Sequence, residues 1–235
     1  MSTLLMRLAG PLQSWGVESK FEKRGTDRAP SKSGIIGMIA AAMGRRRSDT
    51  IEDLLELKFG VRVDQEGVLL KDYQTVKGEK PYVTNRYYLS DAIFLVGLEG
   101  NINLLEKIDT ALLKPAFPLY LGRRSCPPEG IVSLGIKEQV SLKDALNKEP
   151  WLVSEWRKKR NQNKLNLRIL IDSNIEDDEV LFQRDLPISF NQSRREYGFR
   201  QITEYVQNIQ RSNDGENIEK YGITDHDPLS AFEEE

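Results

Sequence analysis

The sequence predicts an α+β fold, and three observations support this class. An apolar segment at residues 3–9 has the length of a buried strand and ends at a Gly-Pro turn signal. Segments 31–44 and 102–113 have the apolar spacing of helices. Short segments rich in Val, Ile, Leu and Tyr lie between and after them. Helices packed against a sheet are therefore expected.

Start and stop signals locate the first elements after that strand. Ser31 or Ser33 can cap the helix that runs to Gly44. Its small residues fall at helical spacing and leave a smooth stripe for close packing; they are Gly34, Gly37, Ala41 and Gly44. A second helix is expected at 50–59, ended by Gly60, followed by a hairpin that pairs 61–64 with 67–73.

The later elements complete a recognisable order. Residues 91–98 predict a strand, 102–113 an amphipathic helix ended by Pro115, and 131–136 another strand. This order is close to β-α-β-β-α-β with one extra helix, the ferredoxin-like plan shared by RNA-recognition modules. Further strands are expected at 165–171, 180–182 and 202–206. We therefore expect a ferredoxin-like (RRM-like) domain at 1–137, a smaller β-rich part at 138–211 and an acidic tail or linker at 212–235.

Composition excludes several classes of protein. With 235 residues, 39% of them hydrophobic, the chain can fill a core. One cysteine, Cys126, excludes an internal disulfide, and with one histidine it excludes a Cys/His zinc site. No apolar run approaches the roughly 18 residues of a membrane span, and the N-terminus lacks the order of a signal peptide. A cytoplasmic protein without cofactor, metal site or membrane contact is expected.

The charge is unevenly distributed, although the formal net charge is only −2. Residues 212–235 carry eight acidic residues against one basic residue, so residues 1–211 are positive overall. Within them, residues 20–47 carry eight basic and two acidic residues. This concentration indicates either a solvated basic loop or a surface for an anion.

Three segments place glycines beside basic residues, at 7–16, 30–44 and 118–128. Glycine lets a backbone amide approach an anion, and paired arginines match phosphate oxygens. A nucleotide-phosphate loop is excluded because Gly25 is followed by Pro30-Ser-Lys-Ser33, without the second glycine. Residues 73–88 add four tyrosines interleaved with Lys77, Lys80 and Arg86, which predicts a protruding thumb at about 76–88. Such tyrosines either stack on unpaired bases or cover the sheet.

Three functions remain open from the residues alone. The first is a structural RNA-binding subunit. The second is a metal-independent endoribonuclease that uses a pair such as Tyr73 with Lys77, or Tyr120 with Arg123. The third is a protein-interaction module that binds no RNA. The only imidazole, His226, lies between two aspartates in the acidic tail, so histidine-based acid/base catalysis has no obvious agent.

The motifs resemble those of the CasD family, the type I-E Cascade subunits that hold the 5′ handle of CRISPR RNA. The resemblance spans about residues 3–206 and is most specific in Tyr-Leu-Gly-Arg-Arg-Ser-Cys-Pro at 120–127. Other matching motifs are Leu-Ala-Gly-Pro-Leu-Gln-Ser-Trp-Gly at 8–16, Ser-Gly-Ile-Ile-Gly-Met at 33–38, Asp-Tyr-Gln-Thr-Val at 72–76, Tyr-Leu-Ser-Asp-Ala at 88–92 and Leu-Lys-Pro at 113–115. The superfamily places its glycine-rich loop after the second helix of the ferredoxin-like unit.

The resemblance implies a non-catalytic subunit that caps one end of a CRISPR surveillance complex. Its partners would be the CRISPR RNA 5′ handle, the Cascade backbone subunit, the Cascade large subunit, and target DNA near the protospacer-adjacent motif. Type I-C relatives instead cleave precursor RNA, which keeps the endoribonuclease as the alternative. The RNA-binding residues expected are Gln13, Trp15, Arg24, Arg28, Lys32, Ser33, Tyr82, Arg86, Tyr87, Gly122, Arg123, Arg124 and Ser125.

Two features depart from the family pattern. The thumb is expected to be short, and the tail after about residue 209 has no recognised counterpart, so it is a solvated end, a docking peptide or a linker to an appended nuclease domain. The basic run Arg157-Lys-Lys-Arg160 with Lys164 is heavier than the family needs and is either a solvated loop or a contact with DNA.

Overall fold

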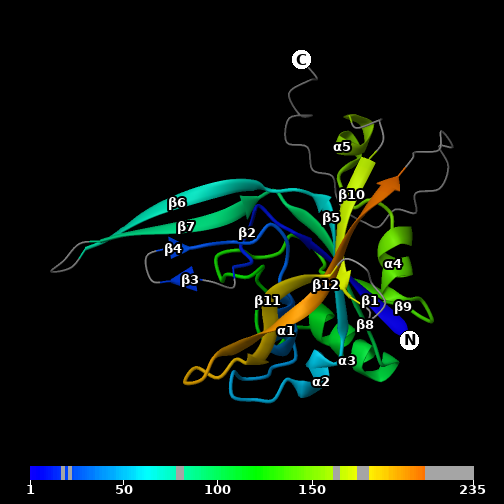
Figure 1. The fold of residues 1–235 in the computed structure, drawn as a ribbon, viewed down its shortest axis with the longest axis horizontal. Coiled ribbons are helices and arrows are strands. Elements are labelled where there is room, and N and C mark those ends of the chain that lie inside the picture. The colour runs from blue at the N-terminus through cyan, green and yellow to red at the C-terminus, as the bar shows by residue number, and fades with distance from the viewer. Residues whose placement is uncertain (17–18, 21–22, 78–81, 161–164, 174–179, 210–235) are drawn as a thin grey trace.

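The computed structural model contains two sheets and five helices in the residues that it describes, which are all except 17–18, 21–22, 78–81, 161–164, 174–179 and 210–235. The predicted α+β class is confirmed, with mostly antiparallel strands. Figure 1 shows a body of helices and strands from which one long hairpin projects.

The larger sheet has seven strands in the order β11-β12-β10-β5-β8-β1-β9. Its strands are β1 (Ser2–Ala9), β5 (Lys58–Gln65), β8 (Ile93–Gly100), β9 (Ser133–Lys137), β10 (Leu165–Asp172), β11 (Leu181–Ser189) and β12 (Glu196–Ile209). All of its strand pairs are antiparallel. The C-terminal strands continue the same sheet, because β10 pairs with β5.

Helices cover both faces of this sheet. Alternate residues of β1 separate the two sides: Leu4 and Leu8 pack in the cluster that includes α1 (Lys32–Ala42) and α3 (Ile102–Leu113), whereas Leu5 packs with α4 (Leu142–Lys148). A strand alternates its side chains between faces, so one short apolar segment supports both layers. Ser31 caps α1 by accepting a hydrogen bond from the Gly34 amide, as predicted.

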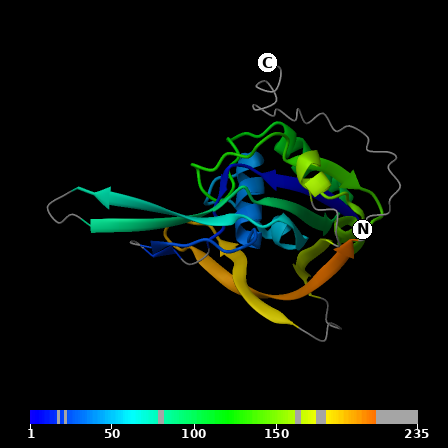
Figure 2. The same ribbon diagram turned by 90° about the horizontal axis from the view of Figure 1, so that it is seen from above.

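The smaller sheet has five strands: β2 (Leu12–Gln13), β3 (Ser19–Lys20), β4 (Lys23–Arg24), β6 (Val68–Val76) and β7 (Tyr82–Ser90). β6 and β7 pair from Val68 opposite Ser90 to Val76 opposite Tyr82. This hairpin is longer than the thumb predicted at 76–88, and both views show it projecting from the body (Figures 1 and 2). We call β6 and β7 the thumb, and β3 with β4 the basic arm.

The helix predicted at 50–59 is wrong over its second half. Only α2 (Glu52–Leu55) is helical there, and β5 begins at Lys58, because residues 58–65 pair with β8. Gly60 is therefore not a helix stop. It lies opposite Gly97 in the sheet, and a Cβ on either residue would meet the leucines of α4 at 2.8 and 2.5 Å. The two glycines let α4 lie close to the sheet.

The hairpin predicted between 61–64 and 67–73 is also wrong. β5 pairs with β8 and β10, whereas β6 pairs with β7 in the other sheet. The chain changes sheets at Gly67, where a Cβ would lie 2.8 Å from the Ala92 Cβ. The strand predicted from 91 starts instead at Ile93, after Asp91 adopts a left-handed φ of 56°.

The basic run at 157–160 lies in α5 (Glu155–Arg160). The predicted tail at 212–235 lies outside the described residues.

Candidate nucleic-acid interface

A tight glycine loop at residues 121–126 forms the centre of the candidate site. The Leu121 amide donates to the Cys126 carbonyl at 2.7 Å, and the Cys126 amide donates to the Arg123 carbonyl at 2.9 Å. Gly122 has a φ of +83°, and a Cβ built on it would lie 1.7 Å from the Ser14 carbonyl oxygen. Only glycine fits there, so the motif folds the loop directly against the segment that follows β1.

Gln13 and Trp15 lie beneath this loop rather than at the surface. Gln13 is fully buried and donates from Nε2 to the Leu8 and Ala92 carbonyls at 3.1 and 2.8 Å. Its Oε1 accepts from the indole Nε1 of Trp15 at 3.0 Å, and Trp15 is only 1% exposed. A Cβ on Gly34 would lie 2.9 Å from the indole ring. Their side chains therefore position the loop and α1, and no polar atom of either is left for RNA.

The basic arm lies between the loop and the middle of the thumb strand β7. β4 pairs in parallel with β7, with Lys23 opposite Asn85 and Arg24 opposite Arg86. Nη2 of Arg123 donates to the carbonyls of Arg24 and Gly25 at 2.9 and 3.0 Å. Three segments that are distant in sequence thus meet at one surface.

Aromatic rings of β7 lie against basic side chains at this surface. The Arg123 guanidinium carbon lies 4.8 Å from the centroid of the buried Tyr88 ring. Nζ of Lys23 lies 5.8 Å from the centroid of the half-buried Tyr87 ring. Tyr87 and Tyr88 are neighbours in a strand, so the two contacts lie on opposite faces of β7, and each orients its own cation.

Four buried polar atoms around β7 have no hydrogen-bond partner: Thr84 Oγ1, Asn85 Oδ1, Arg86 Nε and Arg123 Nη1. Buried polar groups in folded proteins are nearly always paired, and an unpaired one costs about 1–3 kcal/mol. Side chains alternate along β7, so Thr84 and Arg86 share a face with Tyr88, on which Arg123 lies, whereas Asn85 faces the other side. Three of the four atoms therefore lie on the face that the glycine loop contacts, which indicates a surface that a polar ligand completes. Thr84, Asn85 and Lys23 were not among the predicted residues, although the first two lie inside the tyrosine-rich segment.

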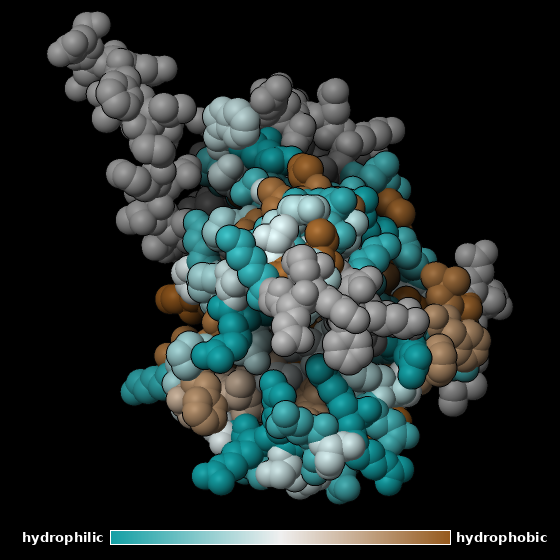
Figure 3. All heavy atoms as spheres, turned by 90° about the vertical axis from the view of Figure 1, so that its left-hand side faces the viewer, coloured by the Kyte–Doolittle hydropathy of each residue, from teal (hydrophilic) through white to brown (hydrophobic). Residues whose placement is uncertain are grey.

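Other predicted residues lie at the surface around this centre. Arg24, Arg28, Tyr82, Arg124 and Ser125 are all exposed. Seen from the side to which the thumb points, hydrophilic side chains cover much of the surface (Figure 3). The exposed cations and the Tyr82 ring are available to a nucleic-acid chain.

Lys32 and Ser33 are not at this surface. Lys32 is 5% exposed, its Nζ pairs with Asp172 at 2.9 Å, and its amide donates to Asp185 at 2.8 Å. Ser33 is 8% exposed and its hydroxyl lies 3.3 Å from that of Ser31. The prediction that their side chains bind RNA conflicts with this burial. Both instead stabilise the start of α1.

A buried ionic cluster surrounds Lys32. Arg200 donates to Asp172 at 2.7 Å and to Asp185 at 2.5 Å, and its guanidinium lies 5.0 Å from the Phe59 ring centroid. Burial alone disfavours the charged guanidinium, but the hydrogen bonds and charges of Asp185 and Asp172 outweigh burial and raise the pKa of Arg200. The cluster joins α1 to β10, β11 and β12.

Reactive groups are scarce near the loop. Burial raises the pKa of the Cys126 thiol, so it is protonated at neutral pH. In the parts of the chain that the structure describes, no group of three or more His, Cys, Asp or Glu residues could hold a metal ion. His226 lies outside these parts. The Tyr120 and Arg123 pair has its arginine engaged by the basic arm.

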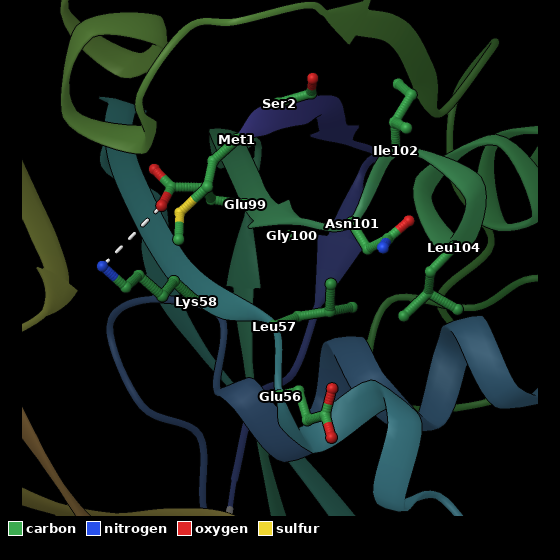
Figure 4. Close-up of a pocket in the computed structure, with 10 residues that line it drawn as sticks. All are labelled: Met1, Ser2, Glu56, Leu57, Lys58, Glu99, Gly100, Asn101, Ile102 and Leu104. Carbon is green, nitrogen blue, oxygen red and sulfur yellow. Dashed lines mark ion pairs between the residues drawn. The ribbon is translucent and has the colours of Figure 1, made fainter.

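A pocket of about 490 Å³ lies at the opposite end of β1 from the glycine loop. Ser2, Leu57, Lys58, Glu99 and other residues line it, and none of the predicted RNA-binding residues is among them (Figure 4). The buried Glu99 accepts from the Leu142 amide at 2.6 Å and pairs with Lys58 at 3.8 Å. Its carboxylate therefore anchors α4, and the pocket is not part of the candidate interface.

No helix among the described residues has both the length and the apolar character needed to cross a membrane.

Comparison with known proteins identifies relatives over most of the chain. The family model described as "CRISPR-associated protein (Cas_Cas5)" matches residues 3–203. The "CRISPR system Cascade subunit CasD" of Escherichia coli (strain K12) is 37% identical over 175 residues, which are 63% of this chain and 78% of that protein.

Two solved structures are also similar. A structure described as "Crystal structure of Cas protein" is 40% identical with a TM-score of 0.68, covering 87% of this chain and 94% of that one. A chain of a "CRISPR RNA-guided surveillance complex" is 33% identical with a TM-score of 0.73, covering 88% and 90%. The predicted resemblance is confirmed, and the chain belongs to the Cas5 family of CRISPR-associated proteins, which it shares with the Cascade subunit CasD.

Proposed function

We propose that this chain is the non-catalytic subunit of a type I CRISPR surveillance complex that binds and caps the 5′ handle of CRISPR RNA. One observation carries the proposal: the glycine loop, the basic arm and the thumb meet at one surface, where three buried polar atoms, Thr84 Oγ1, Arg86 Nε and Arg123 Nη1, lack partners. The similar chain from an RNA-guided surveillance complex supports the assignment.

We infer that β9-β1-β8-β5 with α1 and α3 forms a ferredoxin-like unit. The order of these strands and the position of both helices on one face support this inference. In this division residues 1–137 hold the RNA, 138–211 form the β-rich part, and 212–235 form a tail or linker. The glycine loop then follows the second helix of the unit, the place expected for the RNA-binding loop.

The surface offers different contacts to the phosphates and bases of one strand. Arg24, Arg28 and Arg124 are exposed cations for phosphates, while Tyr82 and Tyr87 present rings on which unpaired bases stack. Asn85 Oδ1 is a buried acceptor without a partner, which suits a base or ribose donor rather than a phosphate.

We propose the partners that membership of such a complex implies. The thumb would reach the backbone subunit, the body would meet the large subunit, and target DNA near the protospacer-adjacent motif would pass close by. The complex would act in the cytoplasm.

The salt dependence of RNA binding tests the phosphate contacts. Replacing Arg124 with alanine removes one exposed cation beside the glycine loop, so the slope of log K against log salt should decrease by roughly 0.7 on single-stranded RNA. The measurement is a titration of fluorescent handle RNA at several salt concentrations. The free energy of unfolding should stay within about 0.5 kcal/mol of wild type, because the side chain is exposed.

Arg47→Ala is the matched control, since Arg47 is an exposed arginine in the loop between α1 and α2. It should leave affinity and slope unchanged. Wild-type protein incubated with repeat RNA in the same series should leave that RNA intact. Unchanged binding by the Arg124 variant would contradict its assignment, and specific cleavage at the handle boundary would support the endoribonuclease instead.

A shortened thumb tests the role of the hairpin in assembly. Residues 75–83 would be replaced by an Asn-Gly turn, which keeps Gln74 paired with Thr84. The excised ends are exposed, as Val76, Tyr82 and Val83 show, so the isolated protein should keep its melting temperature within a few degrees. The assembled complex should lose guide RNA or this subunit during size-exclusion chromatography.

Tyr82→Ala separates the loss of one ring from the loss of hairpin length. It should weaken RNA binding by roughly the 1–3 kcal/mol of one stacked base while the complex still assembles. Stoichiometric assembly of the shortened protein, with the handle still protected from ribonuclease, would show that the thumb is only a surface hairpin.

A further inference from the structure

The two amino groups of Arg123 have different environments. Nη2 is shared between two carbonyls of the basic arm, at 2.9 Å to Arg24 and 3.0 Å to Gly25. The guanidinium also lies 4.8 Å from the Tyr88 ring centroid. Nη1 is buried and has no partner in the protein. Arg123 is therefore not a freely hydrated cation, as a simple phosphate contact would be.

Pairing of the basic arm with its neighbours is short in the part of the chain that the structure describes. β3 and β4 pair over two residues each, and β4 pairs with β7 at Lys23 and Arg24. Beyond β4, the Trp15 amide donates to Thr26 Oγ1 at 2.9 Å, and the Asp27 amide donates to the Trp15 carbonyl at 3.4 Å. The two hydrogen bonds from Arg123 join the arm directly to the glycine loop.

We propose that Arg123 is a positioning residue that fastens the basic arm to the glycine loop and leaves Nη1 as a fixed donor for one acceptor of the bound RNA. This inference rests on the RNA-binding function proposed above. The arm would then hold the cations of Lys23 and Arg24 in place before RNA arrives. When RNA binds, one of its acceptors would pair with Nη1, the amino group of Arg123 that has no partner in the protein. The guanidinium would not need to reorient, because Nη2 already holds it in place.

Lysine should not substitute for this arginine. It keeps the positive charge, but its single ammonium cannot reproduce the planar fork that stacks on Tyr88, reaches two carbonyls and offers a second amino group. Arg124 is exposed, and for a phosphate contact of that kind lysine is a fair replacement. The pair Arg123→Lys and Arg124→Lys therefore distinguishes a positioning role from charge alone.

The experiment compares these two variants of the full chain with wild type. Handle RNA affinity should fall about tenfold or more for Arg123→Lys, as expected for losing charge-assisted hydrogen bonds, and less than about threefold for Arg124→Lys. Without RNA, trypsin should cleave after Lys23 and Arg24 faster in Arg123→Lys, because the arm opens locally. The melting temperatures should match within a few degrees, since the core is untouched.

Each outcome bears on one proposal. Wild-type affinity and wild-type trypsin cleavage of the arm in Arg123→Lys would overturn the positioning role, even if Arg124→Ala still lowered the salt slope. A different outcome is that trypsin cleaves the arm faster in Arg123→Lys, but neither wild type nor variant binds handle RNA. That outcome would overturn the RNA-binding function and support the role of Arg123 in holding the arm. If Arg123→Lys melts early, Thr26→Val, which removes the hydrogen bond from the Trp15 amide without altering the glycine loop, should raise trypsin cleavage and lower affinity in the same way.

Discussion

Gly122→Ala is expected to abolish handle RNA binding and to destabilise the fold by about 4 kcal/mol or more, in the range reserved for severe backbone conflicts. The left-handed φ of +83° alone costs an alanine about 1–2 kcal/mol. The larger effect comes from the Cβ, which would lie 1.7 Å from the Ser14 carbonyl oxygen, so that one of two backbone segments has to move. Chemical denaturation and RNA titration measure the two losses.

Gly130→Ala is the matched control because Gly130 has a similar φ of +70° and nothing within 4 Å of a built Cβ. It should cost only the conformational term of about 1–2 kcal/mol and leave RNA affinity unchanged. Equal effects of the two substitutions would show that the contact with Ser14 contributes nothing.

Asp185→Ala is expected to lower the free energy of unfolding by about 3–5 kcal/mol, because it removes one of the two carboxylates that pair with the buried Arg200 guanidinium. Asp185 is fully buried, and it accepts from Nε and Nη2 of Arg200 and from the Lys32 amide. Its loss leaves Nε of Arg200 and the Lys32 amide without an acceptor, while Nη1 of Arg200 keeps Asp172. Urea denaturation followed by circular dichroism gives the change.

Arg194→Ala provides the control for this substitution. Arg194 pairs with Glu196 at 3.4 Å, but the two side chains are 84% and 46% exposed, so the loss should not exceed about 1 kcal/mol. Asp185→Leu tests whether the free energy of unfolding depends on the carboxylate or only on a side chain that fills the same space. If Asp185→Leu were as stable as wild type, the buried cluster would be dispensable for stability.

Local sequence signals were sufficient to predict those elements whose apolar spacing and capping residues indicate the same structure. The strand at 2–9, the helix capped by Ser31, and the helix at 102–113 with its cap at Asn101 follow from short-range apolar spacing and side-chain hydrogen bonds. The motif at 120–127 likewise indicated a special backbone, since Gly-Arg-Arg-Ser-Cys-Pro needs a glycine conformation that other residues avoid.

The errors occur where pairing with a distant segment decides the structure. Residues 56–59 continue a helical pattern in sequence, yet from Lys58 the chain pairs with β8, beginning with Lys58 opposite Glu99. Gly60 looks like a helix end but serves the packing of α4. The partner of β6 could not be read from the adjacent hairpin signal, because the chain crosses to another sheet at Gly67.

The sequence by itself determined the α+β class, the glycine loop and the membership of the Cas5 family, because these depend on residue types at fixed spacing. Only the tertiary structure decided which basic residues face outward. Lys32 and Arg124 both lie in basic, glycine-containing segments, but Lys32 meets the carboxylates of Asp172 and Asp185 from strands more than 130 residues later, while Arg124 is exposed. A charge is free for a ligand only when no distant residue neutralises it, and that depends on how the sheets assemble.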